Sequence, residues 1–401
     1  MIHNYYKHRG GEGISFAAEA EALRALGHVV DTFSLDNAVD LEKRNRIQTA
    51  INSIWSRESY NTVRSLLQNK SYDVLHVQNF FPLLSPSVYD AAKSCGVPVV
   101  QALRNYRLFC MQTGLFRDGK ICESCSGGKH SWAGIKHRCY RDSLGASLTL
   151  SVMIEFHRLR NTWANRVDAF VAVSDCVKQK YVSNGWNPNQ IRVKHNTVSP
   201  APDIGKGEQG NFVVVGRLSE DKGLLVLLDA WEILMQQCSP EDIPLLKVIG
   251  DGPLEQTLRD DVVRRGLSDC VVIVGRLLLE ATYTELGNAL ASIQPSVRFE
   301  PCSRTIAESY AKGTPVIAAK IGGTVELVSD GVSGFHFEPG DASALAEIVY
   351  RLWKDPKIAL SMRATARKFF DDKFSPQKNA EQLVSIYEAV INHAGSCIGN
   401  V

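Results

Sequence analysis

The sequence predicts an α/β protein of two Rossmann-like, doubly wound domains facing a cleft, and three observations support this fold class. Short apolar runs rich in β-branched residues alternate with helix-like segments, which is typical of parallel sheets covered by crossover helices. A stretch rich in Pro, Gly and polar residues at 196–210 interrupts the alternation and indicates an interdomain linker. The length of 401 residues suits two domains of ordinary size.

The alternation divides into two series of expected strands. The N-terminal series comprises residues 74–77, 97–100, 169–173 and 191–193, with helix-like segments at 15–26, 85–95 and 175–184. The second series comprises residues 212–215, 245–249, 271–274, 292–294, 316–319 and 334–337. We therefore predict domains at residues 1–198 and 199–375, followed by a C-terminal helix within residues 376–401. Ligands of doubly wound sheets bind beyond the carboxyl ends of the strands.

Composition excludes several classes of protein. Hydrophobic residues make up 44% and charged residues 22% of the chain, as in a soluble globular protein. The net charge of +2 gives no reason to expect a nucleic-acid partner. No apolar run approaches the roughly 20 residues that span a bilayer, and residues 1–9 lack the apolar core of a signal peptide. We therefore expect a cytoplasmic protein.

Two glutamates flank a strand-to-helix junction in the second series. A buried strand is expected to end near residue 295, and a helix at 303–312 to stop at Gly313. The start of such a helix presents free backbone N–H groups, which suit a diphosphate. Glu300, on the loop, would face the sugar attached to that diphosphate. Glu308, one to two turns into the helix, could accept hydrogen bonds from a ribose.

A second set of polar residues follows the strand expected at 212–215. Gly216 allows close approach of the backbone to a ligand. Arg217 and Lys222 supply positive charge where a leaving diphosphate accumulates negative charge, and such charges stabilise a transition state when they are already in position.

Taken together, these segments resemble the retaining glycosyltransferases of family 4 (group 1), which have the GT-B fold, and in particular members of the polysaccharide-assembly type. The resemblance depends on the E-x7-E spacing at 300–308, the segments at 311–317 and 322–334, and the G-R-x-x-x-x-K-G pattern at 216–223. It covers nearly the whole chain and is strongest from 210 to 340.

The resemblance implies a bacterial, retaining hexosyltransferase. It would move a hexose-type sugar from a nucleotide diphosphate sugar to a glycan or a lipid-linked oligosaccharide during polysaccharide, O-antigen or lipopolysaccharide biosynthesis. UDP is the commonest donor nucleotide in the family, while GDP and ADP remain open. Residues 1–198 would bind the acceptor, residues 199–375 the donor, and the helix within 376–401 would cross back onto the N-terminal domain.

The resemblance also assigns roles on the donor side. Glu300, Arg217 and Lys222 would be catalytic. Donor binding would fall to Gly216, Gly250, Arg276, Leu277, Cys302, Ser303, Arg304, Thr305 and Glu308. No Asp-x-Asp metal signature is evident near these elements. A helix N-terminus with Arg and Lys can replace a divalent cation at the diphosphate, so we expect transfer that requires no metal or other cofactor.

On the acceptor and phosphate side, the matching positions are Gly10, Gly11, His76, Asn79, Arg104 and Asn105. The two glycines belong to a glycine-rich segment at 8–13 before the first helix. His76 fits an acceptor role and a buried structural role equally well. Arg104 and Asn105 stand where many members carry His-Asp, so Arg104 could orient the diphosphate or an anionic acceptor. Front-side attack needs no general base there, because the leaving phosphate can accept the proton.

Four cysteines cluster in an insert at 106–142: Cys110, Cys122, Cys125 and Cys139. Their spacing is compatible with four thiolates around a structural zinc. His130 or His137 could substitute for one ligand. Reduced thiols are the alternative, and disulfides are the least expected in a cytosol.

The segment 104–166 carries eleven Lys and Arg residues against four Asp and Glu, with apolar residues among them. This pattern suggests peripheral contact with an anionic membrane, on the inner face of the cell membrane, where lipid-linked acceptors lie. An equally good interpretation is a cleft-facing helix pair whose charge serves the donor phosphates.

Two rival functions remain. A nucleotide-sugar epimerase of similar fold is disfavoured by the intact pair of glutamates with Arg217 and Lys222. A catalytically inactive member that binds nucleotide and scaffolds an assembly complex is kept open by Arg104-Asn105, and by Cys302 where glycine is more usual.

Overall fold

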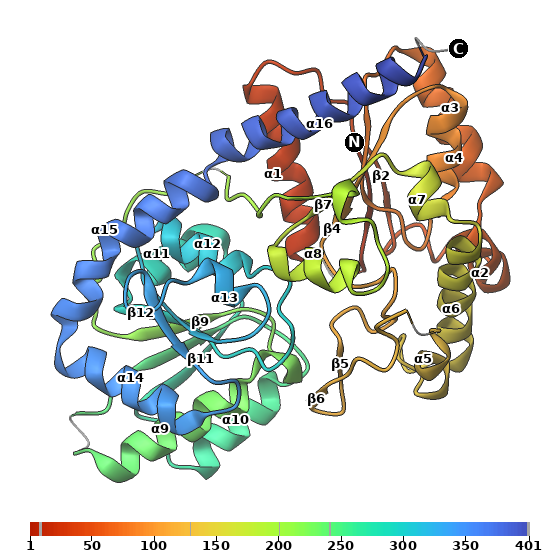
Figure 1. Ribbon diagram of the computed structural model, residues 1–401. Coiled ribbons are helices and arrows are strands. Elements are labelled where there is room, and N and C mark those ends of the chain that lie inside the picture. Colours follow the sequence, from red (N-terminus) through yellow and green to blue (C-terminus); the bar gives the residue numbers. More distant parts are fainter. Residues whose placement is uncertain (8–9, 129, 200, 240–241, 399–401) are drawn as a thin grey trace. The chain divides into compact units, whose positions relative to one another are not determined.

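The structure is a computed structural model that describes residues 1–7, 10–128, 130–199, 201–239 and 242–398 (Figure 1). His8 and Arg9 of the glycine-rich segment, Lys129 of the insert and residues 399–401 of the C-terminal segment lie outside the described residues. The chain forms two compact units. The first comprises Met1–Arg117, Cys122–His195 and Pro376–Val401, and the second Asp118–Ile121 and Asn196–Ser375.

The first unit is built on a sheet in which all neighbouring strands are parallel. Its strands are β1 (Ile2–Tyr5), β2 (Phe33–Asp36), β3 (Leu75–Asn79), β4 (Val99–Leu103), β7 (Ala169–Ala172) and β8 (Ile191–Val193), in the order β2-β1-β3-β4-β7-β8. The strand order reverses between β1 and β3. In a doubly wound sheet, such a switch point opens a crevice at the carboxyl ends of the two strands.

Helices connect these strands, with side-chain caps at several N-termini. They are α1 (Gly11–Ala25), α2 (Arg46–Ile54), α3 (Arg57–Asn69), α4 (Ser87–Ser94), α5 (Trp132–Lys136), α6 (Leu144–Leu159), α7 (Thr162–Arg166), α8 (Asp175–Val182) and the 3₁₀ turn η1 (Pro188–Gln190). The insert also carries the short strands β5 (Phe116–Arg117) and β6 (Lys120–Ile121). Asn45, Ser56, Ser143 and Ser174 each accept a hydrogen bond from a first-turn N–H group.

Helix α1 begins at Gly11 rather than at residue 15, so the glycine-rich segment lies partly inside the first turn. Glycine has a poor helix propensity, which is why the sequence indicated a loop. Gly13 fits there because it packs against an aromatic ring: a Cβ on Gly13 would lie 2.9 Å from Cε1 of Tyr5.

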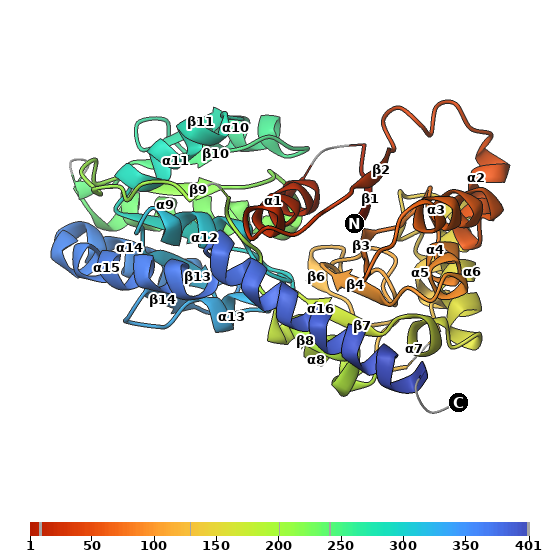
Figure 2. The same cartoon turned by 90° about the horizontal axis from the view of Figure 1, so that it is seen from above.

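The C-terminal helix α16 (Pro376–Ile398) belongs to the first unit. Its buried residues Ala380, Leu383 and Ile386 pack with Leu23 of α1 and Val100 of β4. Helices α1 and α16 lie side by side in both views (Figures 1 and 2). Segments from the two ends of the chain therefore cover one face of the sheet.

The second unit also has a parallel sheet, with the order β11-β10-β9-β12-β13-β14. Its strands are β9 (Phe212–Val215), β10 (Leu246–Ile249), β11 (Val271–Gly275), β12 (Ala291–Gln294), β13 (Val316–Ala319) and β14 (Gly334–Phe337). The predicted strands of this half are confirmed to within one residue at either end. The strand order reverses between β9 and β12, which sets the switch point of this unit.

Helices cover both faces of this sheet. They are η2 (Glu220–Lys222), α9 (Leu224–Gln237), α10 (Glu255–Arg264), α11 (Leu279–Asn288), α12 (Arg304–Ala311), α13 (Thr324–Leu327), α14 (Ala342–Lys354) and α15 (Pro356–Lys373). Phe212 and Val214 pack with Trp231 of α9, whereas Val213 between them packs with Tyr310 of α12. Alternate residues of β9 are thus buried on opposite faces, as expected of a parallel strand. No helix among the described residues has the length and apolar character to cross a membrane.

Candidate active site

The loops after β9 and β12 carry the predicted catalytic residues of the second unit to its switch point. Arg217 and Lys222 follow β9, and Glu300 follows β12. Lys222 Nζ donates a hydrogen bond to Glu300 Oε2 at 2.7 Å. Two residues that are 78 positions apart are therefore in direct contact. Arg217 is exposed on the same loop as Lys222.

Glu300 is a buried, ionised carboxylate, with only 6% of the residue exposed. Ser296 Oγ donates to Glu300 Oε2 at 3.2 Å, and Arg298 Nε lies 3.6 Å from the same oxygen. Burial alone would raise the pKa of Glu300, but the charges of Lys222 and Arg298 outweigh it and lower the pKa to about 2. At neutral pH the carboxylate can therefore accept hydrogen bonds from a ligand but cannot supply a proton.

Two glycines back the Glu300 loop. Gly323 N–H donates to the Glu300 carbonyl oxygen at 2.7 Å. Gly322 has a φ of +65°, and a Cβ there would lie 2.6 Å from the Glu300 nitrogen. Only glycine allows the two backbones to touch in this way, which explains the Gly-Gly pair in the sequence.

The start of α12 is held at the same switch point. Thr305 Oγ1, in the first turn, donates to the carbonyl oxygen of Val215 at the end of β9, at 3.2 Å. Ser303 occupies the N-cap position, but its hydroxyl donates to Gln294 Oε1 at 3.1 Å and does not cap the helix. The first-turn N–H groups of α12 therefore carry no side-chain cap, which leaves them available to an anion.

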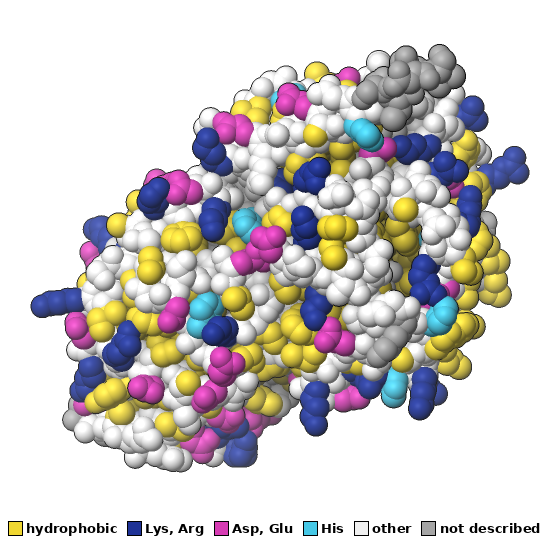
Figure 3. Space-filling model, in the orientation of Figure 1, with side chains coloured by type: hydrophobic (Ala, Val, Ile, Leu, Met, Phe, Trp, Pro, Cys, Tyr) yellow, Lys and Arg dark blue, Asp and Glu magenta, His cyan; other side chains and the backbone are white. Residues whose placement is uncertain are grey.

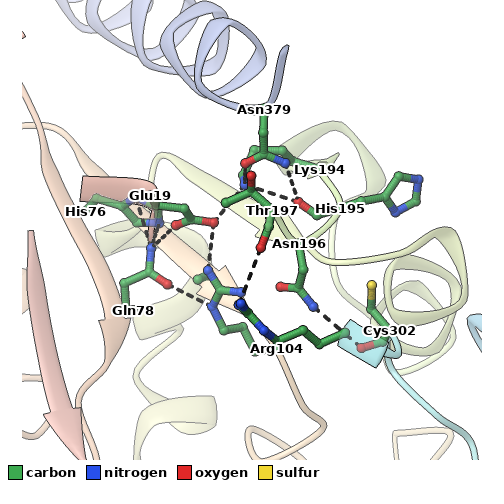
Figure 4. Close-up of polar contacts among 12 residues, drawn as sticks. Glu19, His76, Gln78, Arg104, Lys194, His195, Asn196, Thr197, Cys302 and Asn379 are labelled. Atoms are coloured by element: carbon green, nitrogen blue, oxygen red, sulfur yellow. Dashed lines mark hydrogen bonds and ion pairs between the residues drawn. The ribbon is translucent and has the colours of Figure 1, made fainter. Parts of the chain in front are cut away.

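Cys302 and Glu308 complete the predicted set around α12. The carbonyl oxygen of Cys302, which is half-buried, accepts a hydrogen bond from Asn196 Nδ2 at 3.5 Å (Figure 4). Glu308 is buried and accepts from Arg304 Nε at 2.8 Å. Burial raises the pKa of Glu308, and the neighbouring Arg304 only partly offsets this effect.

The remaining donor-side predictions lie at the ends of β10 and β11. Gly250 has a φ of +143°, and a Cβ there would lie 1.8 Å from the Gly216 carbonyl oxygen, so the two loops touch. Arg276 is exposed, and its Nη1 lies 3.4 Å from Asp251 Oδ2. Leu277 is half-buried against the core that includes α12.

A cavity of about 30 Å³ lies at the carboxyl ends of β3 and β4 in the first unit. Asn79, Arg104 and Asn105 line it, so the structure brings these three predicted residues together. Gly10 and Gly11 are exposed at the start of α1 and do not line this cavity. Neither does His76.

Arg104 forms a buried ion-pair cluster beside this cavity (Figure 4). Glu19 Oε1 accepts from Arg104 Nη2 and from Lys194 Nζ, both at 2.7 Å. Gln78 joins them, donating to Glu19 Oε2 at 2.6 Å and accepting from Arg104 Nε at 2.8 Å. Burial would raise the pKa of Glu19, but Arg104 and Lys194 hold it well below its ordinary value. The charge of Arg104 is therefore compensated inside the unit.

His76 and Asn79 also bond within the first unit. His76 Nδ1 lies 2.6 Å from the Tyr387 hydroxyl of α16, and burial lowers the pKa of His76 to about 3 despite the nearby Glu19. Asn79 Nδ2 donates to the Asn4 carbonyl oxygen at 2.6 Å. These contacts favour the structural interpretation of His76, and they give Asn79 a role in tying β3 to β1.

Sequence reasoning missed Arg107, which lines the same cavity. Only 8% of the residue is exposed, and its guanidinium carbon lies over the rings of Tyr6, Phe81 and Tyr140, at 5.5, 5.0 and 5.7 Å from the ring centroids. Nη2 donates to the Tyr6 hydroxyl at 3.2 Å. Nε and Nη1 have no hydrogen-bond partner among the described residues. The sequence showed Arg107 only as one basic residue among eleven.

Glu12 is the second residue missed. It lies in the first turn of α1, lines the cavity and accepts a hydrogen bond from Asn105 Nδ2 at 2.7 Å. Tyr6 bonds to both Glu12 and Arg107, so the three side chains form one network at the switch point. Its members come from segments that precede and follow β3 in the sequence, so no local pattern could have joined them.

The two sheets with these strand orders are those of the GT-B glycosyltransferases, and solved structures agree. Anabaena Alr3699/HepE in complex with UDP has a TM-score of 0.68 at 18% identity, covering 97% of this chain and 99% of that one. Sucrose-phosphate synthase of Thermosynechococcus elongatus has a TM-score of 0.69 at 18% identity, covering 97% and 96%. At these identities the likeness concerns the fold alone.

Family models cover most of the chain. Residues 10–197 match the glycosyl transferase 4-like domain, and residues 202–369 match the glycosyl transferases group 1. The chain belongs to the group 1 glycosyltransferases.

Curated relatives are similar over part of their length. The O-antigen chain mannosyltransferase C of Escherichia coli is 31% identical over 182 residues, 45% of this chain and 47% of that protein. The amylovoran biosynthesis glycosyltransferase AmsK of Erwinia amylovora is 32% identical over 179 residues, 43% of each chain. The matches thus span less than half of these two relatives. A match across 96% of both chains, at 22% identity, is to the uncharacterized glycosyltransferase MJ1607 of Methanocaldococcus jannaschii.

Proposed function

We propose that this protein is a retaining glycosyltransferase that moves a hexose-type sugar from a nucleotide diphosphate sugar to a glycan or lipid-linked glycan during polysaccharide or O-antigen biosynthesis. The observation that carries the proposal is the buried Glu300–Lys222 contact at the second unit's switch point, beside the uncapped start of α12. UDP is the first candidate for the nucleotide, because Anabaena Alr3699/HepE, which has the same fold, was solved in complex with UDP.

The donor diphosphate would lie against the first-turn N–H groups of α12. Arg217 and Lys222 would add positive charge, and together they would replace a divalent cation at the diphosphate. Gln294 supports this position, since its buried Nε2 has no partner among the described residues and lies at the end of β12. Glu308 would accept a hydrogen bond from the ribose.

The chemistry requires one bond exchange at the anomeric carbon. The acceptor hydroxyl oxygen forms a bond to that carbon from the face that the diphosphate leaves, while the bond from carbon to phosphate oxygen breaks. The hydroxyl proton passes to the departing phosphate oxygen, so no protein base is needed and the configuration is retained. Glu300, ionised and fixed by Lys222, would accept hydrogen bonds from the sugar hydroxyls and hold the ring.

The acceptor would bind at the switch point of the first unit. Arg107 presents two buried N–H groups there that have no partner among the residues the structure describes, and Glu12 lines the same cavity. A buried guanidinium recognises a phosphate or carboxylate strongly. This supports an acceptor that carries an anionic group, as the phosphate of a lipid-linked glycan does.

Helix α6 supports a peripheral membrane contact of the first unit. Five exposed side chains recur at helical spacing along it: Leu144, Leu148, Val152, Phe156 and Leu159. Ile47 and Ile51 of α2, which packs against α6, are exposed by 72% and 61%. Figure 3 shows hydrophobic side chains at the right-hand edge of the view, where α2 and α6 lie, with Lys and Arg among them. An apolar face with flanking basic residues suits peripheral docking on anionic lipid.

The test is a donor screen of the purified protein. UDP-, GDP- and ADP-sugars would be incubated with and without EDTA, with lipid-linked and free glycan acceptors, while released nucleotide and product stereochemistry are followed. We expect release from one donor that EDTA leaves unchanged, that Glu300→Gln slows by about 10²- to 10³-fold, and that gives a product with retained configuration. Nucleotide binding without turnover would favour a scaffold, interconversion of the donor sugar an epimerase, and an inverted product would exclude the retaining mechanism.

A further inference from the structure

Four cysteines of the first unit have no part in the proposed transfer reaction, yet they surround one space. Cys110, Cys122, Cys125 and Cys139 all line a cavity of about 20 Å³. A cavity holds one water-sized sphere from roughly 10–15 Å³ upward, so there is room for a single ion. These residues come from three separate stretches of the insert, and the fold brings them together.

The backbone beside two of the sulfurs adopts unusual conformations. Burial raises the pKa of the Cys110 thiol to about 11, and the backbone N–H groups of Leu115, Thr113 and Gln112 only partly offset this effect. Thr113 and Leu115 adopt positive φ values of 71° and 52°, a conformation that costs energy for residues other than glycine. Such N–H groups stabilise negative charge on sulfur and orient a metal ligand.

Burial also raises the pKa of the Cys125 thiol, and the nearby backbone of Gly134 partly offsets this effect. A Cβ on Gly134 would lie 2.3 Å from the Met111 side chain, so the chain packs closely there. The turn after Cys125 is also tight: Gly127 has a φ of +71°, and Ser126 N–H donates to the Glu123 carbonyl oxygen at 3.0 Å.

The donor set consists of sulfur alone. His130 is exposed and lies 3.0 Å from Glu155, and His137 is exposed too, so neither predicted substitute lines the cavity. None of the four cysteines forms a disulfide. Four thiolates in one place favour zinc, whereas oxygen ligands favour magnesium or calcium.

The thiols surround the cavity without yet converging on one point. Among the described residues, no three His, Cys, Asp or Glu side chains stand close enough together to hold a metal ion. Zinc binding releases the thiol protons and brings each sulfur to about 2.3 Å from the metal. Zinc binding therefore requires small rotations of the cysteine side chains that line the cavity.

The location of the four cysteines connects them to Arg107. Cys110 N–H donates to the Tyr106 carbonyl oxygen at 2.8 Å, and Tyr106 N–H donates to the Thr113 carbonyl oxygen at 3.1 Å. The Arg107 side chain therefore projects from a turn anchored at Cys110. On its other side it stacks on the ring of Tyr140, which follows Cys139 directly.

We propose that Cys110, Cys122, Cys125 and Cys139 bind one structural Zn²⁺ as thiolates, and that this ion fixes the two chain segments that hold Arg107 in place. Zinc binding can be measured without the donor nucleotide or the transfer reaction, so a failure of this proposal and a failure of the proposed function are distinguishable.

The test measures zinc in the full chain, purified under reducing conditions without chelator. Elemental analysis is expected to give about one zinc per chain in the wild type. The variant with both Cys122→Ser and Cys125→Ser is expected to hold less than about a tenth of that. Cys95→Ser is the matched control, because Cys95 is a half-buried cysteine of the same unit that does not line the cavity. X-ray absorption of the wild type should show four sulfur neighbours at about 2.3 Å.

A second measurement covers the case in which the double variant fails to fold. In the wild type, alkylation with a thiol reagent should spare four cysteines until a strong chelator is added, and peptide mapping should identify them as these four. Wild-type protein without zinc that alkylates at all four positions at once would establish reduced thiols. Protection relieved only by reductant would establish disulfides. Either result, iron with sulfide in place of zinc, or zinc lost equally in Cys95→Ser would overturn the proposal.

Discussion

The two units present polar residues at equivalent points of their sheets, but they use them differently. In the second unit, the loops after β9 and β12 form a small charged group around Glu300, and Arg217 is exposed on the same loop as Lys222. In the first unit, the residues after β3 and β4 are mostly bonded inside the unit, as the Arg104–Glu19 ion pair shows. A position at a switch point therefore does not by itself give a residue a role in ligand binding. A residue at a switch point is available to a ligand only if its hydrogen-bonding groups do not already have partners inside the unit.

The substitution Glu19→Gln in the first unit should have the largest effect on stability. It should lower the free energy of unfolding more than it lowers turnover. The change leaves Arg104 and Lys194 buried without their counter-charge, and breaking such a cluster costs about 3–5 kcal/mol. Denaturant unfolding monitors this loss. Glu58→Gln, which removes an exposed pair with Arg44, should cost less than about 1 kcal/mol. A loss for Glu19→Gln no larger than that of Glu58→Gln would contradict a stabilising role for the cluster.

Glu300→Gln should show the opposite pattern. The neutral amide no longer pairs with Lys222 or holds the sugar as a carboxylate does, so turnover should fall about 10²- to 10³-fold. The change is measured as kcat with the matched donor, alongside the thermal unfolding midpoint to show that the protein is folded. Near-normal kcat in a folded variant would remove Glu300 from the mechanism.

Low pH should destabilise the second unit by protonating the Glu300 carboxylate. The folded-state pKa of Glu300 is about 2, below the ordinary value of 4.5, so its ionisation stabilises the fold at higher pH. That contribution is lost as pH falls from about 4.5 towards 2, and it is on the order of 3 kcal/mol. Wild type should lose more stability than Glu300→Gln across this range. Parallel stability curves for the two proteins would contradict the lowered pKa.

The variant Arg107→Met tests whether the switch point of the first unit binds the acceptor. If the unpaired N–H groups of Arg107 bind an anionic acceptor, KM for that acceptor should rise about 10- to 100-fold, while donor hydrolysis without acceptor is unchanged. Arg64→Met, which changes an exposed arginine of α3, should leave both values unaltered. Equal losses of donor hydrolysis and acceptor transfer would point to misfolding or to a donor role.

The smallest expected effect concerns the exposed face of α6. Leu148→Glu should weaken binding to vesicles that contain anionic phospholipid by about tenfold, because about 1.4 kcal/mol of apolar burial is lost. Leu66→Glu, at an exposed leucine on α3, is the control and should bind as wild type does. Equal binding of wild type and Leu148→Glu in a flotation assay would mean that α6 does not face the lipid.

Much of the second unit could be predicted from the sequence. Its strands are short, apolar runs buried on both faces, and such runs give a clear signal. The edge strand β2 of the first unit was missed, because its residues are largely half-buried and include polar ones. The early start of α1 was missed because its first turn contains two glycines.

The remaining site residues could not be predicted, because the residues that they contact lie far away in the sequence. Glu19 lies 85 residues from Arg104 and 175 from Lys194, and no local pattern links them. Lys222 and Glu300 are almost as far apart, yet both were predicted, because each stands in a segment that resembles the family. Arg107 stands in no such segment. Glu12 lies within the glycine-rich segment at 8–13, but only the tertiary structure shows that its side chain lines the cavity.

Hydrogen–deuterium exchange of the full chain with and without UDP reports which unit binds the nucleotide. We expect slower exchange in residues 216–223 and 302–308 of the second unit at saturating UDP, with the same segments unchanged in Lys222→Met at the same concentration. Slower exchange confined to the first unit, or binding of UDP without any change in those two segments, would contradict the assignment of the donor site.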